Sequence, residues 1–267
     1  MSAASTIAAT TATARRADRA DWFAAHAFTL LVIAAWAYAA TQIPPIALSG
    51  PWTTVKALGA FLGDRNQLAH MVYSLMHVGI AIAISFFIGN ALAFLAHYAP
   101  VTALMVHGRI SPFLNAFSGI GWALLSLLWL GANHLTVIFS ISMVLIPFAL
   151  VNMKEGLATV DRELIEMGRS FGRAGFKRFT RIVVPSLYPF MFATLRIAFG
   201  VAWKVALTAE LIGGGSGFGY LFDLARQDYR TPILFVVILL IILFVYCADR
   251  FGFEPIQRRL QRHYGTR

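Results

Sequence analysis

The sequence predicts an all-α integral membrane protein with about six transmembrane helices. Hydrophobic residues make up 58% of the chain and charged residues 13%, whereas a soluble domain is roughly a quarter charged and about half apolar. No Lys, Arg, Asp or Glu occurs between Arg65 and Arg109, or between Arg109 and Lys154. Each of these gaps exceeds the roughly 20 apolar residues that a spanning helix needs. The composition therefore disfavours a large soluble helical protein.

The apolar runs define the predicted spans in chain order. Two of them begin at a hydroxyl followed by proline, Ser111-Pro112 and Thr231-Pro232, which suits an N-cap and the first helical position. Six helices are predicted in all, at Trp22–Thr41, His70–His97, Pro112–Leu130, Leu135–Met153, Leu187–Ala209 and Pro232–Ala248.

The two ends of the chain are predicted to lie outside the membrane domain, which covers residues 21–250. Residues 1–20 are expected to form a disordered N-terminal tail, and residues 251–267 a basic C-terminal tail. Ala37-Tyr38-Ala39 has the small-x-small pattern of a signal cleavage site. The apolar run before it is longer than a usual signal core, so a retained first helix is the favoured interpretation.

The formal net charge of +10 follows the predicted topology. Cations cluster near residues 15–19, within 162–181 and within 250–267, and six spans put all three clusters on one side. Such an excess of Lys and Arg marks the cytoplasmic side. The sequence thus predicts a multi-pass protein of the bacterial cytoplasmic membrane with both termini in the cytoplasm. A nucleic-acid partner is not needed to explain the charge.

Motifs for chemistry are missing from the sequence. His70 and His77 can share a helix face, but no further ligand stands at metal spacing near them, so packing roles are favoured. The Gly213–Gly219 run ends without the lysine and hydroxyl of a phosphate loop, and a flexible turn between helices is the better interpretation. Cys247 is the single cysteine, which leaves no internal disulfide. No cofactor is expected on this chain, and uphill transport would need energy from another subunit.

The most charged stretch, Arg162–Leu187, is predicted to form two short amphipathic helices on the cytoplasmic side. Asp161 can cap the first, with Glu163 and Glu166 near the positive end of the helix dipole. Gly172 interrupts the helix, and Pro185 marks entry to the next span. The apolar face of the first helix comprises Leu164, Met167 or Gly168, and Phe171. Such an element can lie on lipid or dock into a partner protein, and its physical pattern alone leaves both open.

This stretch resembles the cytoplasmic loop of ABC importer permeases. That loop carries Glu-Ala-Ala, three residues, Gly, nine residues and then Ile-x-Leu-Pro. Here Glu166-Met167-Gly168, Gly172 and Ile182-Val183-Val184-Pro185 fall at the same spacing. Met-Gly replaces Ala-Ala and Val replaces Leu, so Met167 is the largest departure from the pattern.

Two further segments are similar to permeases of the nitrate/sulfonate/taurine group. They are Ser111–Gly131 and Leu195–Leu221, and the whole likeness covers roughly residues 70–250. In that group a proline commonly stands near the position of Gly121, so the Pro112–Leu130 helix is expected to bend differently here.

The resemblance implies a type I ABC importer permease fold with a cytoplasmic coupling helix in loop 160–185. Two permease copies, identical or closely related, would form the pathway, and a periplasmic or lipid-anchored solute-binding protein would deliver the substrate. A cytoplasmic ATPase dimer would use ATP and Mg²⁺ and receive the loop in a groove. The residues expected to couple to that ATPase are Glu163, Leu164, Glu166, Met167, Gly168, Phe171, Gly172, Ile182 and Pro185.

Charges inside one predicted span suggest a substrate pathway. Arg196, Gly200 and Lys204 follow each other at i, i+4 and i+8, which places them on one side of a helix. One interpretation is a cationic line that suits an anionic substrate; the other is that Arg196 pairs or snorkels and Lys204 reaches the outer interface. For Arg196 the structural role is favoured, and for Lys204 the two are even. The remaining pathway candidates are Asn115, Trp122, for both of which packing is favoured, and Glu210.

The favoured function is therefore the permease subunit of an ATP-driven importer for a small solute, and an anion such as a sulfonate, nitrate or organic acid is the candidate class. One alternative is an ATP-independent secondary transporter, which would need inverted repeats and broken helices with ion ligands. Another is an integral membrane enzyme, which would need clustered His or acidic residues at a membrane face. Neither alternative explains the spacing of Glu166, Gly172 and Pro185.

Overall fold

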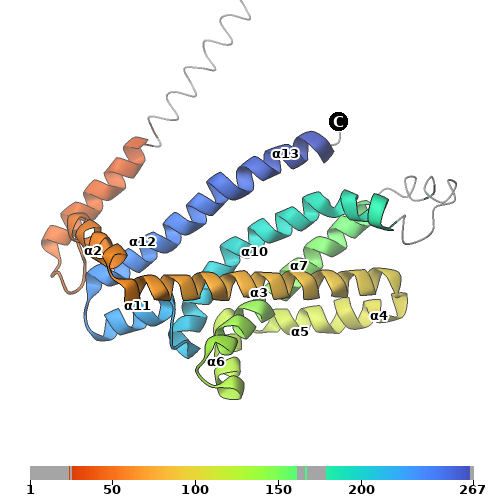
Figure 1. Cartoon of the computed structure of the whole chain (residues 1–267), viewed down its shortest axis with the longest axis horizontal. Coiled ribbons are helices and arrows are strands. Elements are labelled where there is room, and N and C mark those ends of the chain that lie inside the picture. Colours follow the sequence, from red (N-terminus) through yellow and green to blue (C-terminus); the bar gives the residue numbers. More distant parts are fainter. Residues whose placement is uncertain (1–23, 25, 161–165, 167–178, 265–267) are drawn as a thin grey trace, which may run out of the picture.

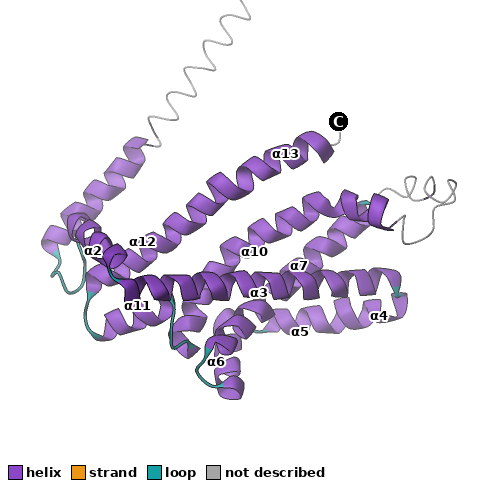
Figure 2. Cartoon of the chain, viewed as in Figure 1, coloured by secondary structure: helices purple, strands orange, loops and turns teal. Residues whose placement is uncertain are grey.

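The computed structural model describes residue 24, residues 26–160, residue 166 and residues 179–264. All regular elements within these ranges are helices (Figure 2). An N-terminal helix covers residues 26–42. The labelled elements that follow are α2 (Pro51–Gly63), α3 (Arg65–Tyr98), α4 (Pro100–Met105), η1 (Val106–Ile110), α5 (Ser111–Ala116), α6 (Gly119–Leu130), α7 (His134–Thr159), η2 (Phe179–Val183), α10 (Val184–Gly213), α11 (Phe218–Gln227), α12 (Thr231–Cys247), η3 (Ala248–Phe253) and α13 (Glu254–Tyr264).

The core of the fold lies among α3, α7, α10 and α12, the long apolar helices (Figure 1). Val78 of α3, Ile141 of α7 and Ala202 of α10 are at most 2% exposed and belong to one buried cluster. The backbones of α3 and α7 approach closely at Gly89, where an added Cβ would lie 2.5 Å from Ala149 Cβ. Only a residue without a side chain permits this approach.

The total of about six spans stays a prediction, because the described residues cover only part of the first predicted span. Among the described residues, four helices are long and apolar enough to cross a membrane, namely Arg65–Tyr98, His134–Thr159, Phe179–Gly213 and Thr231–Arg259. A bent pair, Pro100–Ala116 with Gly119–Leu130, brings the number to five if it counts as one span. The predicted first span, Trp22–Thr41, reaches beyond the described residues, as do the N-terminal tail 1–20 and the end of the C-terminal tail.

The predicted span Pro112–Leu130 is wrong as a single helix. Its two halves meet at 86°, because Phe117 and Ser118 adopt extended backbone between α5 and α6. The Ser118 hydroxyl then accepts a hydrogen bond from Gly121 N (3.3 Å) and caps α6. Ser111, the expected cap, lies instead inside a helical path that begins at Pro100 and continues through η1.

The last span is longer than predicted, because α12, η3 and α13 follow one another in line (Figure 1). The expected hydroxyl cap at Thr231 is also wrong. α12 has no side-chain cap, and the Thr231 hydroxyl donates to Ile46 O in the segment before α2. This bond ties the start of the last span to the N-terminal part of the chain.

Candidate functional site

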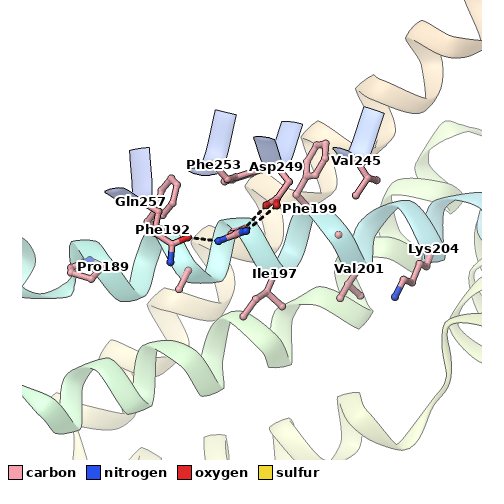
Figure 3. Close-up of a pocket in the computed structure, with 13 residues that line it drawn as sticks. Pro189, Phe192, Ile197, Phe199, Val201, Lys204, Val245, Asp249, Phe253 and Gln257 are labelled. Carbon is pink, nitrogen blue, oxygen red and sulfur yellow. Dashed lines mark hydrogen bonds and ion pairs between the residues drawn. The ribbon is translucent and has the colours of Figure 1, made fainter. Parts of the chain in front are cut away.

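A cavity of about 730 Å³ opens between α10 and the last helical segment (Figure 3). One wall carries the predicted line Arg196, Gly200 and Lys204 of α10, together with Phe192 and Phe199. Val245, Asp249, Phe253 and Gln257 of the α12–η3–α13 segment form the other wall. The i, i+4, i+8 spacing thus brings the three predicted pathway residues to one cavity. We call this space the α10 cavity.

Arg196 is engaged across the α10 cavity by the last helical segment. Its Nε donates to Asp249 Oδ1 (2.6 Å), and its Nη2 donates to Asp249 Oδ2 (2.9 Å). Its Nη1 donates to the side-chain oxygen of Gln257. Bidentate pairs of this kind fix the guanidinium in one plane. This geometry fits the pairing interpretation of Arg196, whose charge is balanced by Asp249.

Lys204 lines the same cavity in a different electrostatic setting. Its side chain is exposed, and none of the described residues forms an ion pair or hydrogen bond with its ammonium group. Figure 3 shows Lys204 at the far end of the cavity from Pro189, away from the Arg196–Asp249 pair. The α10 cavity therefore contains one balanced cation and one unbalanced cation among the residues that line it.

The other three pathway candidates lie outside the α10 cavity. Asn115 is exposed on α5 and donates to Ser111 O (3.0 Å). Trp122 is 2% exposed, and its indole N–H donates to Leu114 O (3.2 Å) across the break between α5 and α6. This burial fits the packing interpretation of Trp122.

Glu210, the last pathway candidate, is 0% exposed near the end of α10. Its carboxylate accepts hydrogen bonds from Ser74, His77 and the backbone of Gly219. His77 is buried as a packing residue would be, but both of its ring nitrogens lie within hydrogen-bonding distance of polar side chains. Glu210 belongs to a buried polar cluster, and its assignment to an open pathway is not supported by this geometry.

Most of the predicted ATPase-coupling residues fall outside the described ranges. These are Glu163, Leu164, Met167, Gly168, Phe171 and Gly172. Glu166 is described as helical and exposed, Ile182 lies in η2, and Pro185 is at the start of α10, both half-buried. The described ends of the segment are close together, because Met153 and Leu157 of α7 share a buried cluster with Val183 and Leu187.

Sequence reasoning missed the partners of Arg196 and Glu210. Asp249 is 53 positions from Arg196, and Ser74 is 136 positions from Glu210. One signal was present for Asp249, since it is the charged residue that ends the uncharged run after Arg230, and a charge next to a span suggests a partner for Arg196. Ser74 offered no comparable signal.

Comparisons with known proteins agree with this architecture. A family model described as binding-protein-dependent transport system inner membrane component matches residues 43–253. The chain is 33% identical to the aliphatic sulfonates transport permease SsuC of Escherichia coli over 47% of this chain and 48% of that protein. It is 22% identical to the taurine permease TauC of E. coli over 86% and 85%. An inward-facing structure of the MetNI methionine ABC transporter superposes with a TM-score of 0.63 at 15% identity, over 74% of this chain and 99% of that one.

Proposed function

Because the chain belongs to the family of binding-protein-dependent transport system inner membrane components, we propose that it carries a small anion such as a sulfonate, nitrate or an organic acid. The chain is the permease subunit of an ATP-driven ABC importer and a multi-pass membrane protein. In such systems separate ATPase subunits hydrolyse the ATP. The permease itself therefore supplies the pathway and the mechanical link.

The proposed assembly contains two permease copies, identical or closely related, in the bacterial cytoplasmic membrane with their termini in the cytoplasm. A cytoplasmic ATPase dimer binds ATP and Mg²⁺, and a periplasmic or lipid-anchored binding protein delivers the solute. The Arg and Lys distribution of the sequence supports this orientation, since cytoplasmic segments carry the excess of cations.

Segment 160–185 is proposed to insert into a groove of the ATPase. Its support is the buried contact between the ends of the two helices that it joins, α7 and α10, at Met153, Leu157 and Leu187. Force on the segment would reach both helices, because packed interiors have low compressibility. η2 leads directly into α10, so movement of the segment would displace the helix that lines the α10 cavity.

Substitutions within the segment test this role. We expect Gly172→Pro and Glu166→Lys to abolish uptake and to weaken recovery of the ATPase with the permease from solubilised membranes. Proline restricts the backbone at the turn, and lysine reverses the charge at the acidic motif position. Glu155→Lys, on the exposed surface of α7 just before the segment, is the matched charge reversal and leaves both readouts unchanged. Normal uptake with both segment variants would refute the assignment.

The substrate proposal rests on Lys204 as the unbalanced cation in the α10 cavity. An ionisable group within a span is costly and usually serves a partner, cavity or pathway. An anionic solute passing Lys204 would gain a charge-assisted hydrogen bond that a neutral solute lacks. The names of the sulfonate and taurine permeases that resemble this chain agree with such a solute.

Replacing Lys204 with Met tests the substrate class, because methionine retains length and removes charge. A hydrogen bond to a charged group contributes about 1.5 to 3 kcal/mol, so we expect uptake of the anion to fall about tenfold or more. Lys56→Met is the control, since Lys56 lies over the Trp52 ring, 5.4 Å from its centroid, and does not line the cavity. If Lys204→Met takes up both anionic and neutral solutes as fast as the unchanged protein does, the proposed role of Lys204 is refuted.

A further inference from the structure

The Glu210 carboxylate is the centre of a buried polar cluster that joins three helices and one loop. Oε2 accepts from the Ser74 hydroxyl (2.8 Å) and from Gly219 N (2.9 Å), while Oε1 accepts from His77 Nδ1 (2.8 Å). Ser74, His77 and Glu210 are each 0% exposed. α3 contributes the first two side chains, α10 the carboxylate, and the start of α11 the backbone amide.

The loop between α10 and α11 is built around this carboxylate. Gly217 has φ of 107°, which favours glycine, and an added Cβ would lie 2.3 Å from Glu210 Cδ. The next amide, Phe218 N, donates to the Ser74 hydroxyl (2.7 Å), and Gly217 N donates to His70 Nδ1 (3.1 Å). Three successive amides, at the end of the loop and the start of α11, are thus held by side chains of α3 and α10. The run expected to be a flexible turn is therefore fixed by hydrogen bonds.

The cluster extends from the buried carboxylate to an exposed side chain at the start of α7. His77 Nε2 lies 2.8 Å from His134 Nδ1, with one of the two nitrogens bearing the shared proton. His134 is exposed, and Ser216 of the loop lies 3.4 Å from the same Nδ1. The fourth helix contact, at His134, therefore completes a hydrogen-bonded path among α3, α7, α10 and the loop.

A buried ionisable cluster is a costly way to hold a loop. Hydrophobic packing of similar volume is often as stable as a buried ion pair or more so. Directed bonds differ from packing because they fix one relative position of the parts they join. Glu210 also stands on the helix that begins at Val184, directly after η2, so α10 links the coupling segment to the cluster without a break.

We propose that Glu210, with Ser74 and His77, is a positioning unit that locks the α10–α11 loop to α3 and so ties that loop to movement of α10 during transport. The proposal rests on the chain being a permease and not on the charge of its substrate. Release of the bonds would free the loop from α10. The loop would then no longer move together with α10 when ATP is hydrolysed. Fewer solute molecules would therefore be transported per ATP.

Ser216→Cys supplies a reporter, because Ser216 is 8% exposed beside His134 and cysteine is close to it in size. The complex of permease, ATPase and binding protein is reconstituted in nanodiscs with Cys247→Ser, and labelling by a charged maleimide is timed. Glu210→Gln removes the carboxylate charge at nearly constant volume. Because hydrogen bonds to charged groups are the stronger ones, we expect labelling to become about tenfold faster.

The second readout separates positioning from simple stability. In Glu210→Gln we expect ATP hydrolysis without binding protein to rise and the solute moved per ATP to fall, in complexes that retain their ATPase. Asp223→Asn is the matched control, since among the described residues Asp223 of α11 bonds within its own helix alone, to Arg226 and Gln227. It leaves labelling and coupling unchanged.

Ser74→Ala decides the question if Glu210→Gln does not assemble, because it removes one donor to Glu210 and the acceptor of Phe218 N. The same acceleration of labelling and loss of coupling in Ser74→Ala would support the positioning unit. Rates and coupling equal to those of Asp223→Asn would overturn it. Failure of both variants to assemble would also overturn it, since the cluster would then serve folding alone.

Discussion

Arg196 and Glu210 lie on the same helix, but their side chains differ in exposure and in the kind of partner that they bind. The Arg196 side chain is 36% exposed in the α10 cavity, and its partner Asp249 is 46% exposed. Glu210 is fully buried, and its partners come from α3 and from the start of α11. The Arg196 pair joins two helices across the α10 cavity. The Glu210 cluster lies in a packed region, where helices and loop are in direct contact.

This difference predicts which site can change during a transport cycle. A pair with partly exposed side chains contributes little net stability, so it can open and close at small cost. Breaking a buried ionised group away from its partners costs several kcal/mol. The α10 cavity is therefore the adjustable region of the helix, and the Glu210 cluster is its fixed point.

Glu210→Ala should have the largest effect on stability. It leaves His77 and the amide of Gly219 buried without their acceptor, a change that typically costs about 3 to 5 kcal/mol. We expect a large fall in the thermal denaturation midpoint of the detergent-solubilised permease. A midpoint no lower than that of Asp223→Ala, a half-buried residue of α11, would remove the contrast between the two sites.

Gly219→Ala should have the next largest effect. An added Cβ would lie 2.3 Å from Leu207 O, a backbone atom that cannot move away alone. Overpacking of this kind costs about 1 to 3 kcal/mol. Gly215→Ala, in the loop just before α11, is the control, because nothing lies within 4 Å of an added Cβ there. Equal denaturation midpoints for the two variants would show that the loop is not held tightly against α10.

The Arg196–Asp249 pair should have the smallest effect. In a double-mutant cycle of Arg196→Gln and Asp249→Asn, we expect a coupling energy below about 1 kcal/mol in stability. Uptake would still change in each single variant, because both residues line the α10 cavity. A coupling energy as large as the loss in Glu210→Ala would make the two sites equivalent and break the comparison.

The apolar runs of the sequence were sufficient to place the long helices. The predicted spans His70–His97 and Leu135–Met153 lie within α3 and α7, and Leu187–Ala209 lies within α10. The line from Arg196 to Lys204 was also predictable, because it depends only on helical spacing within one element. The family likeness found in segment 160–185 agrees with the family that the comparisons identify.

Features that depend on contacts between distant parts of the chain were not predictable in the same way. Trp122 could not be assigned to the break between α5 and α6, because the helix was expected to be continuous there. Glu210 has the local sequence of a pathway residue, because its partner His77 lies 133 positions away in the chain. Local sequence indicates that a buried charge needs a partner, but it does not identify which one.

The bend between α5 and α6 has a consequence for the lipid around the protein. α4, η1 and α5 contain 6, 5 and 6 residues, so together they rise about 25 Å, less than the roughly 30 Å hydrocarbon core of a bilayer. Exposed backbone is not tolerated at that depth unless protein or water satisfies it, and the Trp122 indole supplies one such bond to Leu114 O. The depth of the bend in the membrane thus depends on the thickness of the bilayer. Lipids with longer acyl chains would place the bend deeper in the hydrocarbon, and lipids with shorter chains would leave it in the headgroup region.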